Sequence, residues 1–218
     1  MSDNRYDIPF KHPCTILVSG PTGCGKTRLV RRLIDPSEQL IEPPPQRIIW
    51  VYSEWQEEYD RVLELNPTTE FVHNWNELIY DSLNVQERNL LVIDDQMTEA
   101  HDCKTLVKLF TKGSHHRNLT VIYIVQNVFD KGKYSRTISL YSHYHIVFKN
   151  RRDETQFRIF ATQMLPHHSA WLVDAFADAV KPEYGYMVID NEPKTLETHR
   201  FRTGIFSDET PAFYSEKN

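Results

Sequence analysis

Short apolar runs alternate with amphipathic stretches along much of the chain. Apolar runs that end at glycine or at a polar residue are typical of buried parallel strands. Such runs predict strands over residues 15–19, 47–52, 70–73, 89–95, 120–126 and 145–148. The amphipathic stretches predict helices over residues 26–34, 55–65, 77–83, 103–112, 135–141, 153–164 and 169–180. Residues 186–189 and 199–206 are expected to form late strands or a hairpin.

Strands that alternate with helices imply βαβ units and therefore an α/β fold, in which helices cover both faces of a mainly parallel sheet. The three prolines at residues 43–45 are expected in a surface loop, because proline disrupts helices and central strands. A chain of 218 residues fits one domain at the usual size of about 100 to 200 residues. We place that domain at residues 14–218, after an N-terminal leader of residues 1–13.

The composition indicates a packed globular protein, because 40% of the residues are hydrophobic and 25% are charged. The first residues lack the apolar run of a signal peptide, and no segment approaches the roughly 18 apolar residues of a membrane span. We therefore expect an intracellular protein without a membrane partner. Cys14, Cys24 and Cys103 form no CxxC pair and are odd in number, which argues against a disulfide scaffold or a zinc knuckle.

The charge is unevenly distributed along the chain. The net charge of −5 argues against a general nucleic-acid binder, but residues 104–158 contain 11 Lys and Arg against 3 Asp and Glu. This basic stretch is either a solvated face or a surface that meets phosphates. Within it Lys104, Lys108 and Lys112 recur every four residues, a spacing that forms one positive row on a helix. A second group of cations lies in a glycine-containing loop: Lys131, Lys133 and Arg136.

The clearest motif is GPTGCGKT at residues 20–27, which matches the P-loop pattern G-x-x-x-x-G-K-T. Its glycines allow successive backbone N–H groups to turn inward around phosphates, and the helix that follows directs its positive end at them. In this pattern Lys26 reaches the β- and γ-phosphates, and the Thr27 hydroxyl binds Mg²⁺. We predict a bound nucleoside triphosphate contacted by Gly20, Pro21, Thr22, Gly23, Cys24, Gly25, Lys26 and Thr27.

A pair of acids ends the predicted strand at residues 89–95, and a parallel strand would deliver them to the same sheet edge as the P-loop. There Asp94 is expected to hold Mg²⁺, and Asp95 to orient or deprotonate the attacking water. Gln126 ends the strand at residues 120–126. Its side chain either contacts the γ-phosphate or the attacking water, or hydrogen-bonds a neighbouring loop.

The motifs favour ATP hydrolysis over other P-loop functions. A GTPase needs a DxxG after the magnesium strand, which is absent, and residues 150–153 (NRRD) mimic its N-K-x-D guanine reader with Arg in the Lys position. A nucleotide or small-molecule kinase stays open as an alternative, although no acceptor pocket or arginine-bearing lid has a clear signature. A regulatory module that binds a nucleotide without hydrolysing it is the third possibility.

Five segments within residues 14–163 form a wider pattern: ILVSGPTGCGKT, IIWVYS, LLVIDD, LFTKGSHHRNLTVIYIVQNVF and RTISLYSHYHIVFKNRRD. All P-loop proteins share the first segment, whereas the long central run is far more specific. Together the segments resemble the viral genome-packaging ATPases of the FtsK-HerA group, particularly the poxvirus-type packaging ATPases and their relatives in polinton-like and other double-stranded DNA viruses. Residues 165–218 carry no motif that we can match.

The resemblance implies an additional-strand (ASCE) P-loop fold, in which the strand that ends in Gln126 separates the P-loop strand from the acid strand. It also implies an ATP-driven motor that forms a homo-oligomeric ring, acts on double-stranded DNA and works with a capsid or portal component. Such a protein is expected at sites of virus assembly in the host cell, or in the virion.

In rings of this kind, one subunit's arginine reaches the γ-phosphate bound by its neighbour. Arg117, within the SHHRN segment, is the first candidate, and Arg151 and Arg152 are next. The predicted catalytic set is therefore Lys26, Asp95, Gln126 and Arg117. Many members of the group have glutamate where this chain has Asp95, and the shorter side chain reaches less far.

Histidines and aromatic residues also cluster, but we expect structural roles for most of them. The pairs at residues 115–116, 143 and 145, and 167–168 lack the cysteine or carboxylate partners of a zinc site. His115 and His116 are better suited to presenting Arg117 or contacting phosphate. Trp50, Tyr52 and Trp55 favour core packing over a base-stacking platform.

Overall fold

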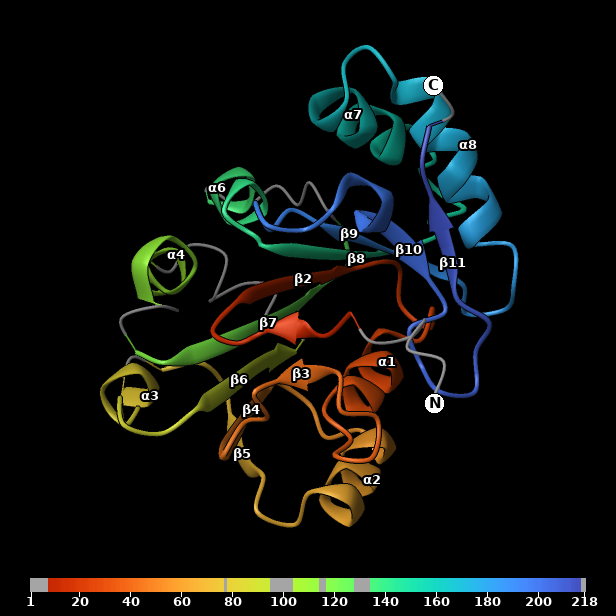
Figure 1. The fold of residues 1–218 in the computed structure, drawn as a ribbon. Helices are drawn as coiled ribbons and strands as arrows, with labels where there is room; N and C mark the ends of the chain where they lie inside the picture. Colours follow the sequence, from red (N-terminus) through yellow and green to blue (C-terminus); the bar gives the residue numbers. More distant parts are fainter. Residues whose placement is uncertain (1–7, 77, 95–103, 114–116, 128–133, 217–218) are drawn as a thin grey trace, which may run out of the picture.

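The computed structural model of the chain describes residues 8–76, 78–94, 104–113, 117–127 and 134–216. Its main sheet has nine strands in the order β11-β10-β9-β8-β2-β7-β6-β4-β5 (Figure 1). These strands are β2 (Thr15–Ser19), β4 (Arg47–Tyr52), β5 (Glu70–His73), β6 (Asn89–Asp94), β7 (Leu119–Val125), β8 (Tyr144–Phe148), β9 (Tyr186–Asp190), β10 (Phe201–Thr203) and β11 (Ala212–Tyr214). A separate small sheet pairs β1 (Phe10–Lys11) with β3 (Ile41–Glu42).

The strand order confirms the additional-strand arrangement. The P-loop strand β2 pairs with β7, and β7 pairs with the acid strand β6, so that one strand separates the two motifs. All pairs from β8 to β5 are parallel, which brings the C-terminal ends of β2, β6, β7 and β8 to one edge of the sheet. The predicted α/β class is therefore confirmed.

The sheet is mixed rather than wholly parallel, because β9, β10 and β11 join β8 through antiparallel pairs. The segments expected to form a late hairpin are β9 and β10. Strand β11 was not predicted, because its three residues are too few to show the alternation of apolar and polar positions that marks a strand. Residues 165–216 thus supply the antiparallel edge of the sheet and the helix α8 (Ser169–Ala179), which covers it.

Helices cover both faces of the sheet (Figure 1). Helices α1 (Lys26–Leu33) and α2 (Glu57–Leu65) bury Leu29, Leu33 and Val62 against one face. The opposite face is covered by α3 (Leu78–Asp81), α4 (Lys104–Lys108), α6 (Ser135–Leu140), α7 (Thr155–Met164) and α8 (Ser169–Ala179). No helix in the described part of the chain is long and apolar enough to cross a membrane.

The helix predicted over residues 103–112 is shorter and less regular than expected. Its α-helical part is α4, and Leu109–Gly113 continues as a π-helical turn. Lys104 and Lys108 are exposed on α4, whereas Lys112 lies in the wider π-helical turn. The regular α-helix predicted over residues 103–112 is therefore wrong in its last turn.

A buried ion pair links the antiparallel strands β9 and β10. Arg202 Nη1 donates to Asp190 Oδ2 at 2.9 Å, and the two side chains are only 3% and 2% exposed. Asp190→Asn should lower the free energy of unfolding by about 3–5 kcal/mol, because the Arg202 charge would stay buried without its counterion. Urea unfolding followed by circular dichroism measures the change.

Asp178→Asn is a matched control, since Asp178 forms its ion pair with Lys181 on the surface. It should shift the unfolding midpoint far less. Equal shifts of the unfolding midpoint for the two variants would show that the buried Asp190–Arg202 pair contributes no more to stability than a surface ion pair.

Candidate nucleotide-binding site

The P-loop connects β2 to α1 at the C-terminal edge of the sheet. Gly23 and Gly25 have φ angles of +80° and +98°, in the left-handed region that favours glycine. This backbone curves around the side chain of Lys26, whose Nζ donates to the carbonyl oxygens of Gly20 at 2.7 Å and Pro21 at 3.0 Å. The ammonium group thus lies against the loop, on the inside of the curve.

Thr27 and Asp94, the two predicted magnesium ligands, lie together. The Thr27 hydroxyl donates to Asp94 Oδ2 at 3.0 Å, although the residues are 67 positions apart. Side chains alternate along β6, so Asp94 points to the same face as Leu90 and Val92, which is the face covered by α1. The Asp94 side chain is therefore carried to the first turn of the P-loop helix.

This donor set suits Mg²⁺, which binds hydroxyl and carboxylate oxygens. Within the described ranges, no group of three or more His, Cys, Asp or Glu side chains could hold a metal ion by itself. Mg²⁺ needs no such group, because it usually keeps several waters and binds one or two carboxylates together with substrate phosphates. The Thr27–Asp94 pair meets that requirement.

Tyr59 is a member of the site that the sequence analysis missed. Its hydroxyl donates to Asp94 Oδ2 at 3.0 Å, and its ring is fully buried among Trp50, Tyr52 and Phe71. Nothing in the pattern of α2 marks this tyrosine as different from a core residue. Trp50 is likewise buried, which agrees with core packing, while Trp55 is 48% exposed at the end of the aromatic cluster.

Two hollows lie beside the P-loop. The first, which we call the acid hollow, encloses about 260 Å³ and contains Lys26, Thr27, Asp94 and Gln126. The second, which we call the basic groove, encloses about 1030 Å³. It is lined by Pro21–Cys24, by residues 148–152 after β8 and by residues 180–185 before β9.

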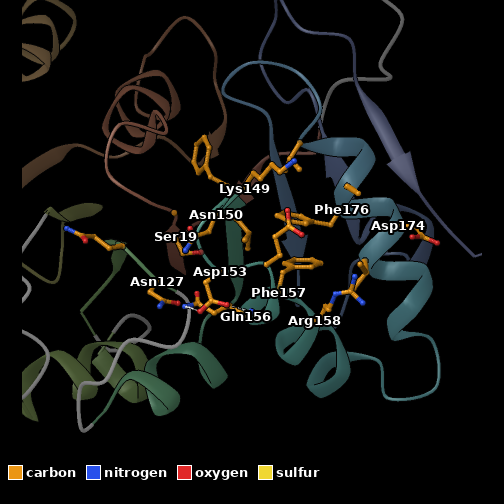
Figure 2. Close-up of a pocket in the computed structure, with 18 residues that line it drawn as sticks. Ser19, Asn127, Lys149, Asn150, Asp153, Gln156, Phe157, Arg158, Asp174 and Phe176 are labelled. Carbon is orange, nitrogen blue, oxygen red and sulfur yellow. Dashed lines mark hydrogen bonds between the residues drawn. The ribbon is translucent and has the colours of Figure 1, made fainter.

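A third cavity, of about 240 Å³, lies on the face of the sheet opposite α1. The rings of Phe157 and Phe176, stacked 3.6 Å apart, form its wall beside α7 and α8, and Ser19 and Asn127 lie across from them (Figure 2). Gln126 lines this cavity, the acid hollow and the basic groove. It therefore lies at the junction of the three, in a position compatible with either of its predicted contacts.

The candidate arginines are far apart. Arg117 precedes β7, whereas the P-loop lies beyond the other end of that seven-residue strand, about 20 Å away at 3.3 Å per residue. The Arg117 guanidinium stacks 4.4 Å from the centre of the Tyr80 ring. Arg151 and Arg152, by contrast, line the basic groove together with the P-loop of their own subunit.

Some predicted residues lie outside the described part of the chain. These are Asp95, Cys103, His115, His116, Lys131 and Lys133. The water-activating role of Asp95 therefore stays a prediction from sequence.

Burial favours the uncharged forms of the Cys24 and His145 side chains. Burial raises the pKa of the Cys24 thiol, which disfavours a reactive thiolate. Burial lowers the pKa of His145 to about 4, so that its imidazole is neutral at physiological pH. Asn191 donates to its Nδ1 at 3.1 Å, and Nε2 lies 3.3 Å from the Ser139 hydroxyl. Both ring nitrogens are thus engaged, in agreement with a structural histidine.

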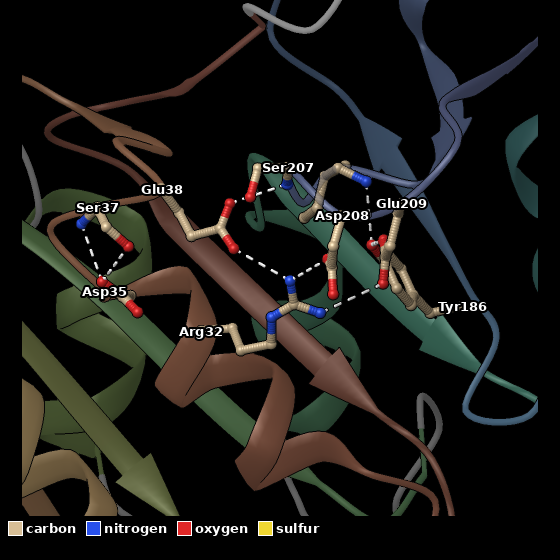
Figure 3. A network of polar contacts seen from close by, with 9 residues as sticks. Arg32, Asp35, Ser37, Glu38, Tyr186, Ser207, Asp208 and Glu209 are labelled. Atoms are coloured by element: carbon tan, nitrogen blue, oxygen red, sulfur yellow. Dashed lines mark hydrogen bonds and ion pairs between the residues drawn. The ribbon is translucent and has the colours of Figure 1, made fainter.

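A polar network joins the P-loop helix to the C-terminal part of the chain. Arg32 of α1 forms ion pairs with Glu38, Asp208 and Glu209 (Figure 3). Its guanidinium carbon also lies 3.9 Å from the centre of the Phe206 ring. The hydrogen bond from Arg32 lowers the pKa of the Asp208 carboxyl. Residues 204–209 are thereby held on the same helix that begins at Lys26.

Comparison with known proteins identifies the fold. No protein-family model matches the sequence. The genome packaging NTPase B204 of Sulfolobus turreted icosahedral virus 2, solved with ATP-γ-S, superimposes with a TM-score of 0.59 and 13% identity. The match covers 93% of this chain and 97% of B204. The chain has the fold of a viral packaging NTPase.

Further structures of B204 agree. The sulfate complex matches with a TM-score of 0.58 and 17% identity over 84% of this chain and 94% of that one. B204 of Sulfolobus turreted icosahedral virus, described as a DNA-packaging ATPase, matches with a TM-score of 0.56 and 12% sequence identity. The match covers 96% of this chain and 100% of that one. The predicted likeness to viral packaging ATPases is thereby confirmed at the level of the fold.

One curated protein shares a short stretch of sequence. Packaging protein 1 of human adenovirus C serotype 5 is 45% identical over 40 residues. The stretch amounts to 18% of this chain and 8% of the adenoviral protein. This chain therefore matches only a small part of that longer protein.

Proposed function

We propose that this protein is an ATP-driven motor that moves viral double-stranded DNA into a capsid. The observation that carries the proposal is the Thr27–Asp94 pair in the acid hollow. Thr27 lies in the first turn of α1, which follows the P-loop strand β2, and Asp94 ends β6, so that β7 separates the two strands as the ASCE fold requires. B204, whose structures are described as those of a DNA-packaging ATPase, supports the assignment through a fold that extends over nearly the whole chain.

The proposed hydrolysis divides among the residues of the acid hollow. Lys26 binds the β- and γ-phosphates, and Mg²⁺, when held by Thr27 and Asp94, neutralises charge on them. Asp95 orients or deprotonates the attacking water, and Gln126 contacts the water or the γ-phosphate. Tyr59 fixes the Asp94 carboxylate through its hydrogen bond. The rate gain comes from positioning and charge stabilisation rather than from a covalent intermediate.

We propose that the duplex is held through its phosphates. Exposed cations in the basic stretch that lie outside the basic groove include Lys104 and Lys108 on α4, and Arg158 on α7. Lysine and arginine contacts to the DNA backbone carry no sequence information, which suits a motor that must move along any sequence. A homo-oligomeric ring and a capsid or portal component complete the proposed assembly.

The function is tested by ATP turnover measured with and without duplex DNA at several salt concentrations. DNA should stimulate turnover, and half-maximal stimulation should need more DNA as salt rises, because released counterions drive phosphate contacts. A kinase or a regulatory module would not respond in this way. Equal turnover with and without DNA, from a protein that stays monomeric with ATP and Mg²⁺, would contradict the motor.

We further propose that Arg117 acts on the γ-phosphate of the neighbouring subunit. Its place at the end of β7 remote from its own P-loop is compatible with action on another subunit. Arg117→Ala and Asp95→Asn should each reduce turnover by about 10³-fold or more. Mixed rings of the two variants should recover part of the activity, since some sites then combine an intact Asp95 with an intact Arg117. Absence of recovery in rings shown to be mixed would rule out action in trans.

A further inference from the structure

The basic groove has a defined position relative to the proposed catalytic centre. Strand β8 runs parallel to β2 and ends at the P-loop edge, while the antiparallel β9 begins at that edge. The turns at residues 149–152 and 181–185 therefore flank one side of the P-loop. The acid hollow, with Asp94, opens on the other side, beside β7 and β6. Thr22, Gly23 and Gln126 line both hollows.

This arrangement assigns a direction to the bound nucleotide. Lys26, Thr27 and Asp94 require the terminal phosphates and Mg²⁺ in the acid hollow. A triphosphate that follows the P-loop from there extends toward the basic groove. The groove, at about 1030 Å³, has room for a nucleoside. Among the residues that the structure describes, four exposed cations line it, Lys149, Arg151, Arg152 and Lys181, against one exposed carboxylate, Glu183.

Two aromatic side chains of the groove lie against the P-loop, the buried Phe148 and the exposed Tyr184. A Cβ atom on Gly25 would be 3.0 Å from Cδ1 of Tyr184, and the Arg28 guanidinium lies 5.6 Å from the centre of the same ring. Tyr184 is nevertheless 49% exposed, so much of the ring is open to the groove. Its φ angle of +59° is uncommon for a residue with a large side chain. Such backbone conformations occur preferentially at ligand-binding sites.

We propose that Tyr184 stacks on the base of the bound nucleotide, so that the basic groove is the nucleoside subsite. Aromatic rings stack on bases through their π-faces, and an exposed ring next to the phosphate-binding loop is suitably placed. Arg28, adjacent to the ring, orients the tyrosine through a cation–π contact. The inference rests on the proposed nucleotide site and is independent of DNA packaging.

The test compares two ligands, ATP and inorganic tripolyphosphate, which lacks the nucleoside. Their dissociation constants are measured by calorimetry with Mg²⁺ and without DNA. Tyr184→Asn removes the ring, and asparagine tolerates the left-handed backbone. It should weaken ATP binding by about 10-fold or more and leave tripolyphosphate binding as in the wild type. Tyr184→Phe, which keeps the ring, should restore most of the ATP affinity.

Tyr141→Asn is a matched control, because Tyr141 is 54% exposed and does not line the groove. It should affect neither ligand. Unchanged ATP affinity in Tyr184→Asn would overturn the proposal. An equal loss for both ligands would also overturn it, because the ring would then act by shaping the P-loop. Wild-type protein that binds neither ligand would refute the proposed nucleotide site itself, and the subsite with it.

Discussion

Lys26→Ala should reduce ATP turnover by at least about 100-fold, because the variant loses the cation that is expected to compensate charge on the β- and γ-phosphates. In the structure this ammonium group lies inside the curve of the P-loop, held by the carbonyl oxygens of Gly20 and Pro21. Within the described part of the chain, no other lysine lines the acid hollow. Steady-state phosphate release, with and without duplex DNA, measures the effect.

Lys194→Ala is the control for Lys26→Ala, since Lys194 is exposed and remote in sequence from every motif of the site. It should leave turnover unchanged. Thermal unfolding of both variants checks that the fold persists. Lys26→Ala protein that hydrolyses ATP at the wild-type rate would contradict the P-loop assignment, and with it the proposed motor.

Asp94→Asn should lower turnover by about 10² to 10³-fold and raise the Mg²⁺ concentration needed for half-maximal activity. The amide keeps the shape of the carboxylate but loses the negative charge that attracts the metal ion. The neighbouring groups, the Thr27 hydroxyl and the Tyr59 hydroxyl, each lie 3.0 Å from Asp94 Oδ2 and still find an oxygen acceptor in asparagine. Turnover titrated with Mg²⁺ separates metal binding from folding.

Tyr59→Phe provides a graded comparison. It removes only the hydroxyl that donates to Asp94, while the buried ring keeps its contacts with Trp50 and Phe71. A loss of about 10- to 100-fold is expected at most, since one hydrogen bond to a charged group contributes roughly 1.5–3 kcal/mol and each 1.4 kcal/mol is tenfold in rate. An unchanged Mg²⁺ requirement in Asp94→Asn would show that Asp94 is not a metal ligand.

The C-terminal part of the chain illustrates how a segment without a motif joins a site. Arg32 lies nearly two turns along the helix that starts at Lys26, and its ion pairs with Asp208 and Glu209 hold that segment against the helix (Figure 3). Tyr184 reaches the P-loop from the same part of the chain. A short sequence pattern predicts neither the Arg32 ion pairs nor the contact of Tyr184 with the P-loop, because each joins residues more than 150 positions apart.

Much of the fold was readable from local patterns, because buried strands and amphipathic helices show their burial within a few successive residues. The P-loop could be predicted for the same reason, because its motif is one continuous segment that includes Gly23, Gly25, Lys26 and Thr27. Where the local pattern is weak, the prediction failed. The strand β11 was not predicted, and an α-helix was predicted where Leu109–Gly113 forms a π-helical turn.

The sequence by itself therefore determined the α/β class, the P-loop motif and the acid at the end of β6. Only the tertiary structure decided which side chains surround them. It brought the Tyr59 hydroxyl to Asp94, laid Tyr184 on the P-loop backbone, and separated Arg117 from the groove that contains Arg151. These contacts depend on how the helices and strand-end turns pack on the sheet, and residue spacing along the chain does not encode that packing.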